Sequence, residues 1–184
     1  MPTPDDAPNP AADPYFGLVS DTFVQLYWRM RLLEEALDRL REHRYAVVVL
    51  DASSWATDED FHRSIADGLE FPDYYGRNLD ALNDCLRDVV DGDYGRPEDS
   101  TGLVLAFTHY DSFARASPRT AQVALDIIAV RARRAAIHSQ RLLCLVHSDD
   151  PDILFEPVGA TPVLWNRAEW LNARRGPQSL VDEP

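Results

Sequence analysis

Residues 71–86 read FPDYYGRNLDALNDCL, a loop that leads into a helix. The aromatic, proline- and glycine-containing part up to Arg77 is typical of a loop. Asn78 suits a helix N-cap, because its side chain can accept a hydrogen bond from a free backbone N–H of the first turn. Apolar side chains then recur at helical spacing, at Leu79, Leu82 and Leu86. The stretch therefore predicts a loop followed by a helix over 79–90.

The same helix carries a second row of side chains, which is acidic. Asp80, Asp84, Asp88 and Asp91 are spaced by three and four residues and share one strip. Like charges one turn apart weaken an isolated helix by about 0.2–0.5 kcal/mol per pair, so this row is costly for stability alone. Residues 58–99 hold thirteen carboxylates and four arginines, and thus nine of the net 13 negative charges. The strip is either a solvated face, with Arg87 paired to Asp84, or a surface for a cationic partner.

Apolar runs on both sides of this segment predict buried strands that alternate with helices. The runs around 46–50, 102–107 and 141–147 have the continuous apolar character of strands in a parallel sheet. Helices are expected over 57–69, with Thr57 as N-cap, and over 117–139. This alternation predicts an α/β fold with a small parallel sheet of three core strands. PVLWN is a candidate for a fourth strand, near 163–166.

The two ends of the chain differ from this pattern. Residues 1–19 begin with a run rich in Pro, Asp and Ala and are expected to form a disordered tail. Apolar residues then recur every three or four positions from Phe23 to Leu40, which predicts an amphipathic helix over 20–43. Residues 149–184 are expected to form an extension that packs on the domain, with a helix at RAEWLNARR and a polar end.

The sequence gives little support to an enzyme. It contains no G-x-G-x-x-G, Walker loop, G-x-S-x-G or H-E-x-x-H pattern. Cys85 and Cys144 lie in apolar stretches and are interpreted as small core residues. Two cysteines are too few for a disulfide framework, which suggests a reducing compartment. We therefore expect no enzyme, no cofactor and no metal, and an enzyme with a metal on paired aspartates is the weakest alternative. The five histidines share no metal-ligand spacing and are interpreted as surface or strand-end residues: His43, His62, His109, His138 and His147.

The charge of the chain bears on its partners. A net charge of −13 repels nucleic acids and anionic membranes and attracts basic proteins. The N-terminal residues lack the basic and apolar regions of a signal peptide, and no apolar run approaches membrane-spanning length. We expect a cytoplasmic monomer that binds neither nucleic acid nor membrane.

FPDYYGRNLDALNDCL closely resembles the central motif of the barstar family, a hydrophobic residue followed by P-x-Y-Y-G-x-N-L-D-A-L-x-D-C-L. Weaker similarity extends over about 46–147. The resemblance implies a barstar-like, three-layer α/β domain over 44–148, with the N-terminal helix and the C-terminal segment as extensions.

In that family a helix and its preceding loop plug the active site of a small ribonuclease, with aspartates in the place of substrate phosphates. By position, Asp84 would be the deepest carboxylate, and Tyr74 would pack on a catalytic imidazole. Asn83 stands where the best-known inhibitor of that family has a large aromatic contact residue, and Arg131, Arg133 and Arg134 stand where that inhibitor has a contacting glutamate. The partner-binding residues implied are Tyr74, Gly76, Asn78, Asp80, Asn83 and Asp84.

The function implied is that of a stoichiometric inhibitor or immunity protein that blocks the active site of a basic nuclease or toxin. The alternative is an intracellular interaction module of the same fold with a non-nuclease partner. Its working surface would be the N-terminal helix or the segment from Trp165 to Trp170.

Overall fold

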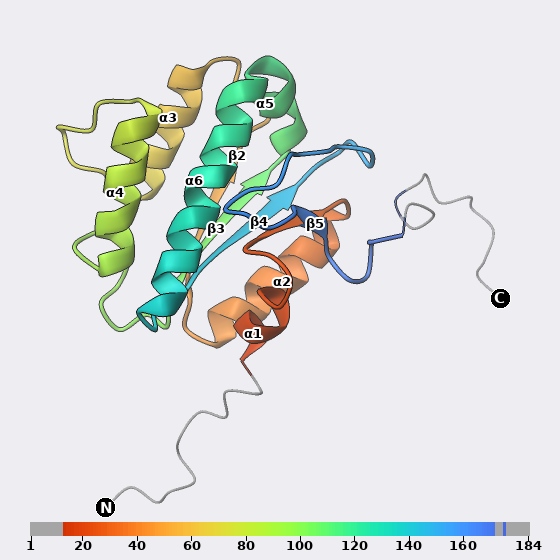
Figure 1. The fold of residues 1–184 in the computed structure, drawn as a ribbon, viewed down its shortest axis with the longest axis horizontal. Coiled ribbons are helices and arrows are strands. Elements are labelled where there is room, and N and C mark those ends of the chain that lie inside the picture. Colours follow the sequence, from red (N-terminus) through yellow and green to blue (C-terminus); the bar gives the residue numbers. More distant parts are fainter. Residues whose placement is uncertain (1–12, 172–174, 176–184) are drawn as a thin grey trace, which may run out of the picture.

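The computed structural model describes residues 13–171 and residue 175. Five parallel strands form one sheet in the order β2-β3-β4-β1-β5, which confirms the predicted α/β class (Figure 1). The strands are β1 (Val24–Tyr27), β2 (Ala46–Asp51), β3 (Leu103–Thr108), β4 (Leu142–His147) and β5 (Leu164–Trp165). The helices are α1 (Pro14–Leu18), α2 (Met30–Glu42), α3 (Asp58–Gly68), α4 (Leu79–Asp91), α5 (Tyr110–Ala116) and α6 (Pro118–Ile137).

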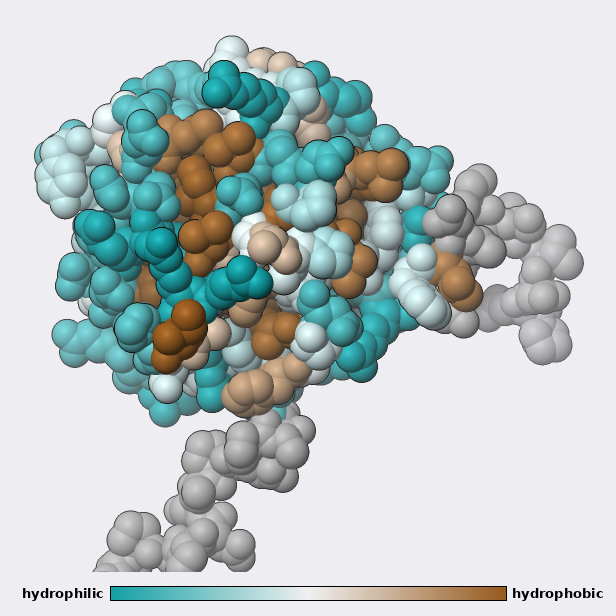
Figure 2. Space-filling model, viewed as in Figure 1, coloured by the Kyte–Doolittle hydropathy of each residue, from teal (hydrophilic) through white to brown (hydrophobic). Residues whose placement is uncertain are grey.

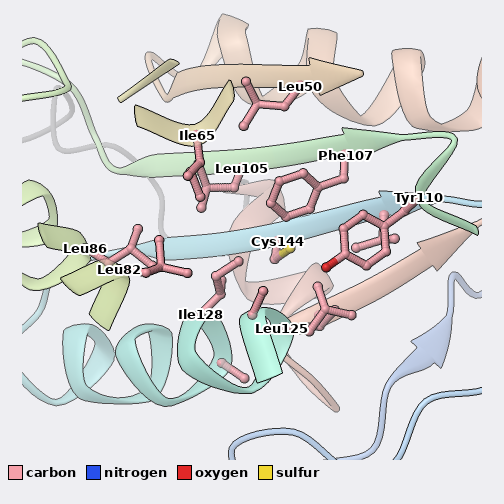
Figure 3. Packing of buried hydrophobic residues seen from close by; sticks show 14 of the residues in the cluster. Leu50, Ile65, Leu82, Leu86, Leu105, Phe107, Tyr110, Leu125, Ile128 and Cys144 are labelled. Carbon is pink, nitrogen blue, oxygen red and sulfur yellow. The ribbon is translucent and has the colours of Figure 1, made fainter. Parts of the chain in front are cut away.

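Alternate side chains of each central strand point to opposite faces of the sheet and build two separate cores. Leu105 and Phe107 face the layer of α3 to α6, where the larger core lies (Figure 3). Val104 and Ala106 face the opposite way and pack with side chains of α1 and α2. The sheet is therefore covered on both faces, as a parallel sheet requires. No helix within the described residues is both long and apolar enough to cross a bilayer.

The N-terminal helix expected over 20–43 is wrong in its first part. Val24–Tyr27 form strand β1, which lies between β4 and β5, and the helix α2 begins only at Met30. All four residues of β1 are buried, including the polar Gln25, so the strand is covered on both faces. Four residues are too few to separate a strand period from a helix period, and Phe23 and Leu26 continued the spacing of α2 by coincidence.

Two further expectations for the ends of the chain need correction. Residues 14–18 of the expected disordered tail form α1, which Asp13 caps and which buries Tyr15, whereas residues 1–12 lie outside the described part. The expected fourth strand is confirmed as β5. The helix expected at RAEWLNARR is absent from its described part, because residues 167–169 form a turn there.

Candidate partner-binding surface

Helix α4 is fixed at both ends and along one side. The Asn78 side chain accepts a hydrogen bond from the backbone N–H of Ala81 at 2.9 Å, as predicted for the N-cap. Gly92 closes the helix with a left-handed φ of 94°. Leu82 and Leu86 are fully buried in the larger core (Figure 3). The helix is therefore a rigid support whose polar side is left for solvent or a partner.

The acidic strip lies on this polar side. Asp80 and Asp84 are exposed, and Figure 2 shows mostly hydrophilic side chains over α4, on the left. Arg87 Nη1 lies 3.6 Å from Asp84 Oδ1, and its Nη2 lies 3.0 Å from Asp88 Oδ1. The Asp84 side chain is still 64% exposed, and surface pairs of this kind contribute about 0–1 kcal/mol. Within the described residues Asp80 has no ion-pair partner, so the strip is accessible.

The loop before α4 turns its two tyrosines in opposite directions. The Tyr75 N–H donates to the Pro72 carbonyl at 2.9 Å, which closes a turn with Tyr74 near its tip. Tyr74 is 75% exposed, whereas Tyr75 is 8% exposed. The Tyr75 hydroxyl lies 2.6 Å from Nδ1 of His62 on α3, and its ring lies 4.8 Å from that of Phe71. Tyr75 thus anchors the loop, and Tyr74 is free for contact.

The imidazole of His62 is the buried half of this anchor. Burial lowers the pKa of His62, although Asp58 and Glu59 act in the opposite direction. When the neutral ring carries its proton on Nε2, its Nδ1 can accept a hydrogen bond from the Tyr75 hydroxyl, which a fully protonated ring could not do. His62 was expected at the surface or a strand end, and this expectation is wrong, because the residue is 3% exposed on α3.

Residues 76–78 complete the loop in an ordered form. The Asn78 Nδ2 donates to the Gly76 carbonyl at 3.2 Å. A Cβ at position 76 would lie 3.0 Å from that Nδ2, so glycine here leaves the Asn78 side chain undisturbed in its capping position. Arg77 adopts a left-handed φ of 47° and pairs with Glu59 of α3. The loop is therefore already ordered, which would lower the entropic cost of a contact with a partner.

Asn83 differs from the other predicted site residues because it is bound within the molecule. Its Oδ1 accepts a hydrogen bond from Arg131 Nε of α6 at 3.0 Å. The side chain is only partly exposed and lies on the side of α4 that meets α6. The structure thus brings the loop residues and the two aspartates along one edge, with Asn83 at its border.

A second polar cluster went unpredicted at the carboxyl ends of β3 and β4. Nδ1 of His109 lies 2.6 Å from Asp149, and Nδ1 of His147 accepts the His109 backbone N–H at 3.2 Å. Potential ligand atoms of these three residues lie within 4.8 Å of one another. His147 Nε2 also bonds the Trp28 carbonyl at 3.1 Å, so both of its ring nitrogens are engaged. Their positions at adjacent strand ends were the available signal.

Comparison with known proteins agrees with this architecture. The model of the family described as "Barstar (barnase inhibitor)" matches residues 45–147, more than half of the chain. Over 44 residues the chain is 50% identical to "Putative ribonuclease inhibitor YrdF" of Bacillus subtilis (strain 168). This aligned stretch makes up 24% of this chain and 48% of that protein. The chain thus spans about half the length of this curated relative. Barstar family inhibitors are non-enzymatic, as expected for this chain, and by the range matched the chain belongs to the barstar family.

Proposed function

We propose that this chain is a stoichiometric inhibitor of a basic ribonuclease, and that it blocks the active site with α4 and the loop before it. The observation that carries the proposal is the exposed pair of carboxylates, Asp80 and Asp84, on a helix whose other side is fully buried. Tyr74 adds an exposed aromatic ring beside them.

The chemistry of a ribonuclease cleft explains why such a surface would bind. The cleft must hold phosphates with cationic side chains, and carboxylates can accept the same charge-assisted hydrogen bonds. The net charge of −13 would accelerate the encounter with a basic protein. Because Tyr75, Asn78 and Arg77 already fix the loop, little binding energy is lost in ordering it.

The alternative of an interaction module draws less support from the segments on which it relied. Leu33, Leu37 and Leu40 of α2 are buried in the smaller core. Trp165 lies in β5, with the guanidinium of Arg175 4.4 Å from its ring centre. Trp170, by contrast, is 67% exposed. The apolar face of α2 and Trp165 hold the fold together, so the exposed carboxylates of α4, with Tyr74 in the loop before them, are the better surface for a cationic partner.

The test is a titration of ribonuclease activity. A panel of purified small basic ribonucleases, with barnase as its first member, is assayed for RNA cleavage at increasing amounts of the chain. Inhibition of a panel member should rise linearly and reach completion at one chain per nuclease, and an excess of RNA substrate should slow its onset. If no basic ribonuclease is inhibited at equimolar concentration, the proposed function is wrong.

A further inference from the structure

A basic pocket lies beside the acidic strip, between α4 and α6. It is a hollow of about 220 Å³ to which α4 contributes Arg87 and α6 contributes Arg131 and Arg134. His138, which follows α6, lies at the same hollow. Asp91 is the one carboxylate among the described residues that line it. Three arginines thus lie around one hollow, although the net charge of the protein is −13.

Arg131 is the central residue of this pocket. It is 7% exposed, and its Nε is used by Asn83. Burial and the nearby cations of Arg134 and Arg87 lower the pKa of its guanidinium. Buried cations in proteins are usually paired with anions. Arg87 pairs with Asp84 and Asp88, but within the described residues neither Arg131 nor Arg134 lies within ion-pair distance of a carboxylate. Two of the three arginines of the pocket therefore lack a direct counter-ion.

We propose that this pocket receives a carboxylate side chain of the same nuclease whose cleft α4 would fill, and that it selects among nucleases. The inference rests on the proposed function. The planar guanidinium of arginine matches a carboxylate with two parallel hydrogen bonds. Asn83, next to Asp84 in α4, bonds Arg131 directly, so one partner could touch both surfaces.

The overall charge favours a protein as the donor of this carboxylate. The field of the chain repels free polyanions such as RNA, whereas a carboxylate on a basic protein is carried in by attraction of the surrounding cations. The nuclease would thus meet carboxylates of the chain with its cationic cleft, and the arginine pocket with an acidic residue at the rim of that cleft. A nuclease without such a residue would face uncompensated arginines and be rejected.

The first arm of the test needs no nuclease. N-acetylglutamate amide is titrated into the full chain at constant ionic strength, and the arginine Nε–Hε resonances are followed by NMR. The Arg131 and Arg134 resonances should shift and saturate at millimolar concentration, whereas the matched neutral N-acetylglutamine amide should leave them in place. Arg134→Gln should weaken the effect at least threefold. A shift that does not saturate, or equal shifts with both compounds, overturns the pocket.

The second arm uses a ribonuclease that the chain inhibits in the titration above. Arg134→Glu should raise the inhibition constant about tenfold or more, whereas Arg119→Glu, an exposed reversal at the other end of α6, should change it less than twofold. Equal inhibition by the two variants overturns the assignment. If inorganic phosphate saturates the pocket at far lower concentration than the glutamate compound, and Arg134→Glu inhibits normally, the pocket serves free anions instead. If the chain inhibits no nuclease, the proposed function is wrong, and so is the claim that a nuclease supplies the carboxylate. The first arm alone decides whether the pocket binds a carboxylate.

Discussion

Tyr74 and Tyr75 are neighbours in the chain, but the first is 75% exposed and the second 8% exposed. Tyr75 is held inside by its ring, which lies 4.8 Å from that of Phe71, and by its hydroxyl, which lies 2.6 Å from Nδ1 of His62 on α3. The position of the exposed ring therefore depends on a buried hydrogen bond that is not itself part of the surface.

Tyr75→Phe tests this anchor. The variant keeps the ring in contact with Phe71 but removes the hydroxyl that is the hydrogen-bond partner of His62 Nδ1. We expect the free energy of unfolding in urea to fall by about 0.5–1.5 kcal/mol. Tyr74→Phe is the matched control, and its unfolding free energy should change by less than about 0.5 kcal/mol because that hydroxyl is exposed. Equal losses in both variants would contradict the anchor.

The same contact predicts a dependence on pH. Burial lowers the pKa of His62, so the unfolded chain binds the proton more readily than the folded chain. Stability from this residue should therefore fall as the pH drops below about 6.5, the ordinary pKa of histidine. His147 acts in the same direction. His109 acts oppositely, because its hydrogen bond to Asp149 raises its pKa and adds stability that is lost as the pH rises through that value.

His62→Phe should isolate the part of the pH-dependent stability that comes from His62. The loss of unfolding free energy between pH 7.5 and pH 5.5 is measured in urea for the wild type and the variant. The variant should be less stable at pH 7.5, because the Tyr75 hydroxyl loses its hydrogen-bond partner, but its loss of stability on acidification should be smaller. The same pH-dependent loss in both proteins would show that His62 does not titrate in this way.

At the scale of elements, β1 decides how the N-terminal region can be cut. It pairs with β4 on one side and β5 on the other, and α2 covers the face that contains Leu143 and Leu145. A chain that starts at residue 44 lacks both elements and should expose this apolar face. We expect it to aggregate or to lose the cooperative urea transition, measured by circular dichroism. A soluble truncated chain with an unchanged urea transition would show that the chain folds without β1 and α2 and would contradict this prediction.

Glu169 ties the C-terminal segment to the start of α2. Its carboxylate is fully buried and accepts the backbone N–H groups of Trp28 and Arg29, each at 3.0 Å. Glu169→Ala leaves both groups without this acceptor and should cost about 3 kcal/mol of unfolding free energy. Glu156→Ala, at an exposed position, should cost less than about 0.5 kcal/mol. Comparable losses in the two variants would contradict the role of Glu169.

Helices α3, α4 and α6 could be predicted from sequence because their signals are local, whereas the short helices α1 and α5 were missed. Thr57 and Asn78 act as N-caps within three residues of the groups they bind, and the apolar rows of α3 and α4 repeat over three turns. β1 could not be recognised, since its partner residues in β4 lie 120 positions away. The motif likewise names partner-binding residues in α4 and the loop before it, which stay a prediction, but it could not give the contacts of His62 or Arg131, which depend on packing between elements.

At the scale of the molecule, the charge of −13 predicts how fast a basic partner binds. Long-range attraction acts on the encounter, so the association rate constant should fall about tenfold or more from 0.05 to 0.5 M salt. The dissociation rate should change less, because contacts within the complex are screened poorly. Stopped-flow mixing with an inhibited ribonuclease measures both rates. An association rate independent of salt would rule out electrostatic steering.

The most direct test of the central claim compares two variants that lose the same charge. Asp84→Asn removes it from the strip on α4, and Glu34→Gln removes it from an exposed position on α2, across the sheet. Desolvated charge pairs at interfaces contribute about 2–5 kcal/mol when truncated, a range to which the barnase–barstar complex itself contributes. The binding free energy for an inhibited ribonuclease should therefore weaken by about 2–5 kcal/mol for Asp84→Asn, which raises the dissociation constant about 30-fold or more, and by less than about 0.5 kcal/mol for Glu34→Gln. Equal affinities of the two variants would contradict the assignment of this surface.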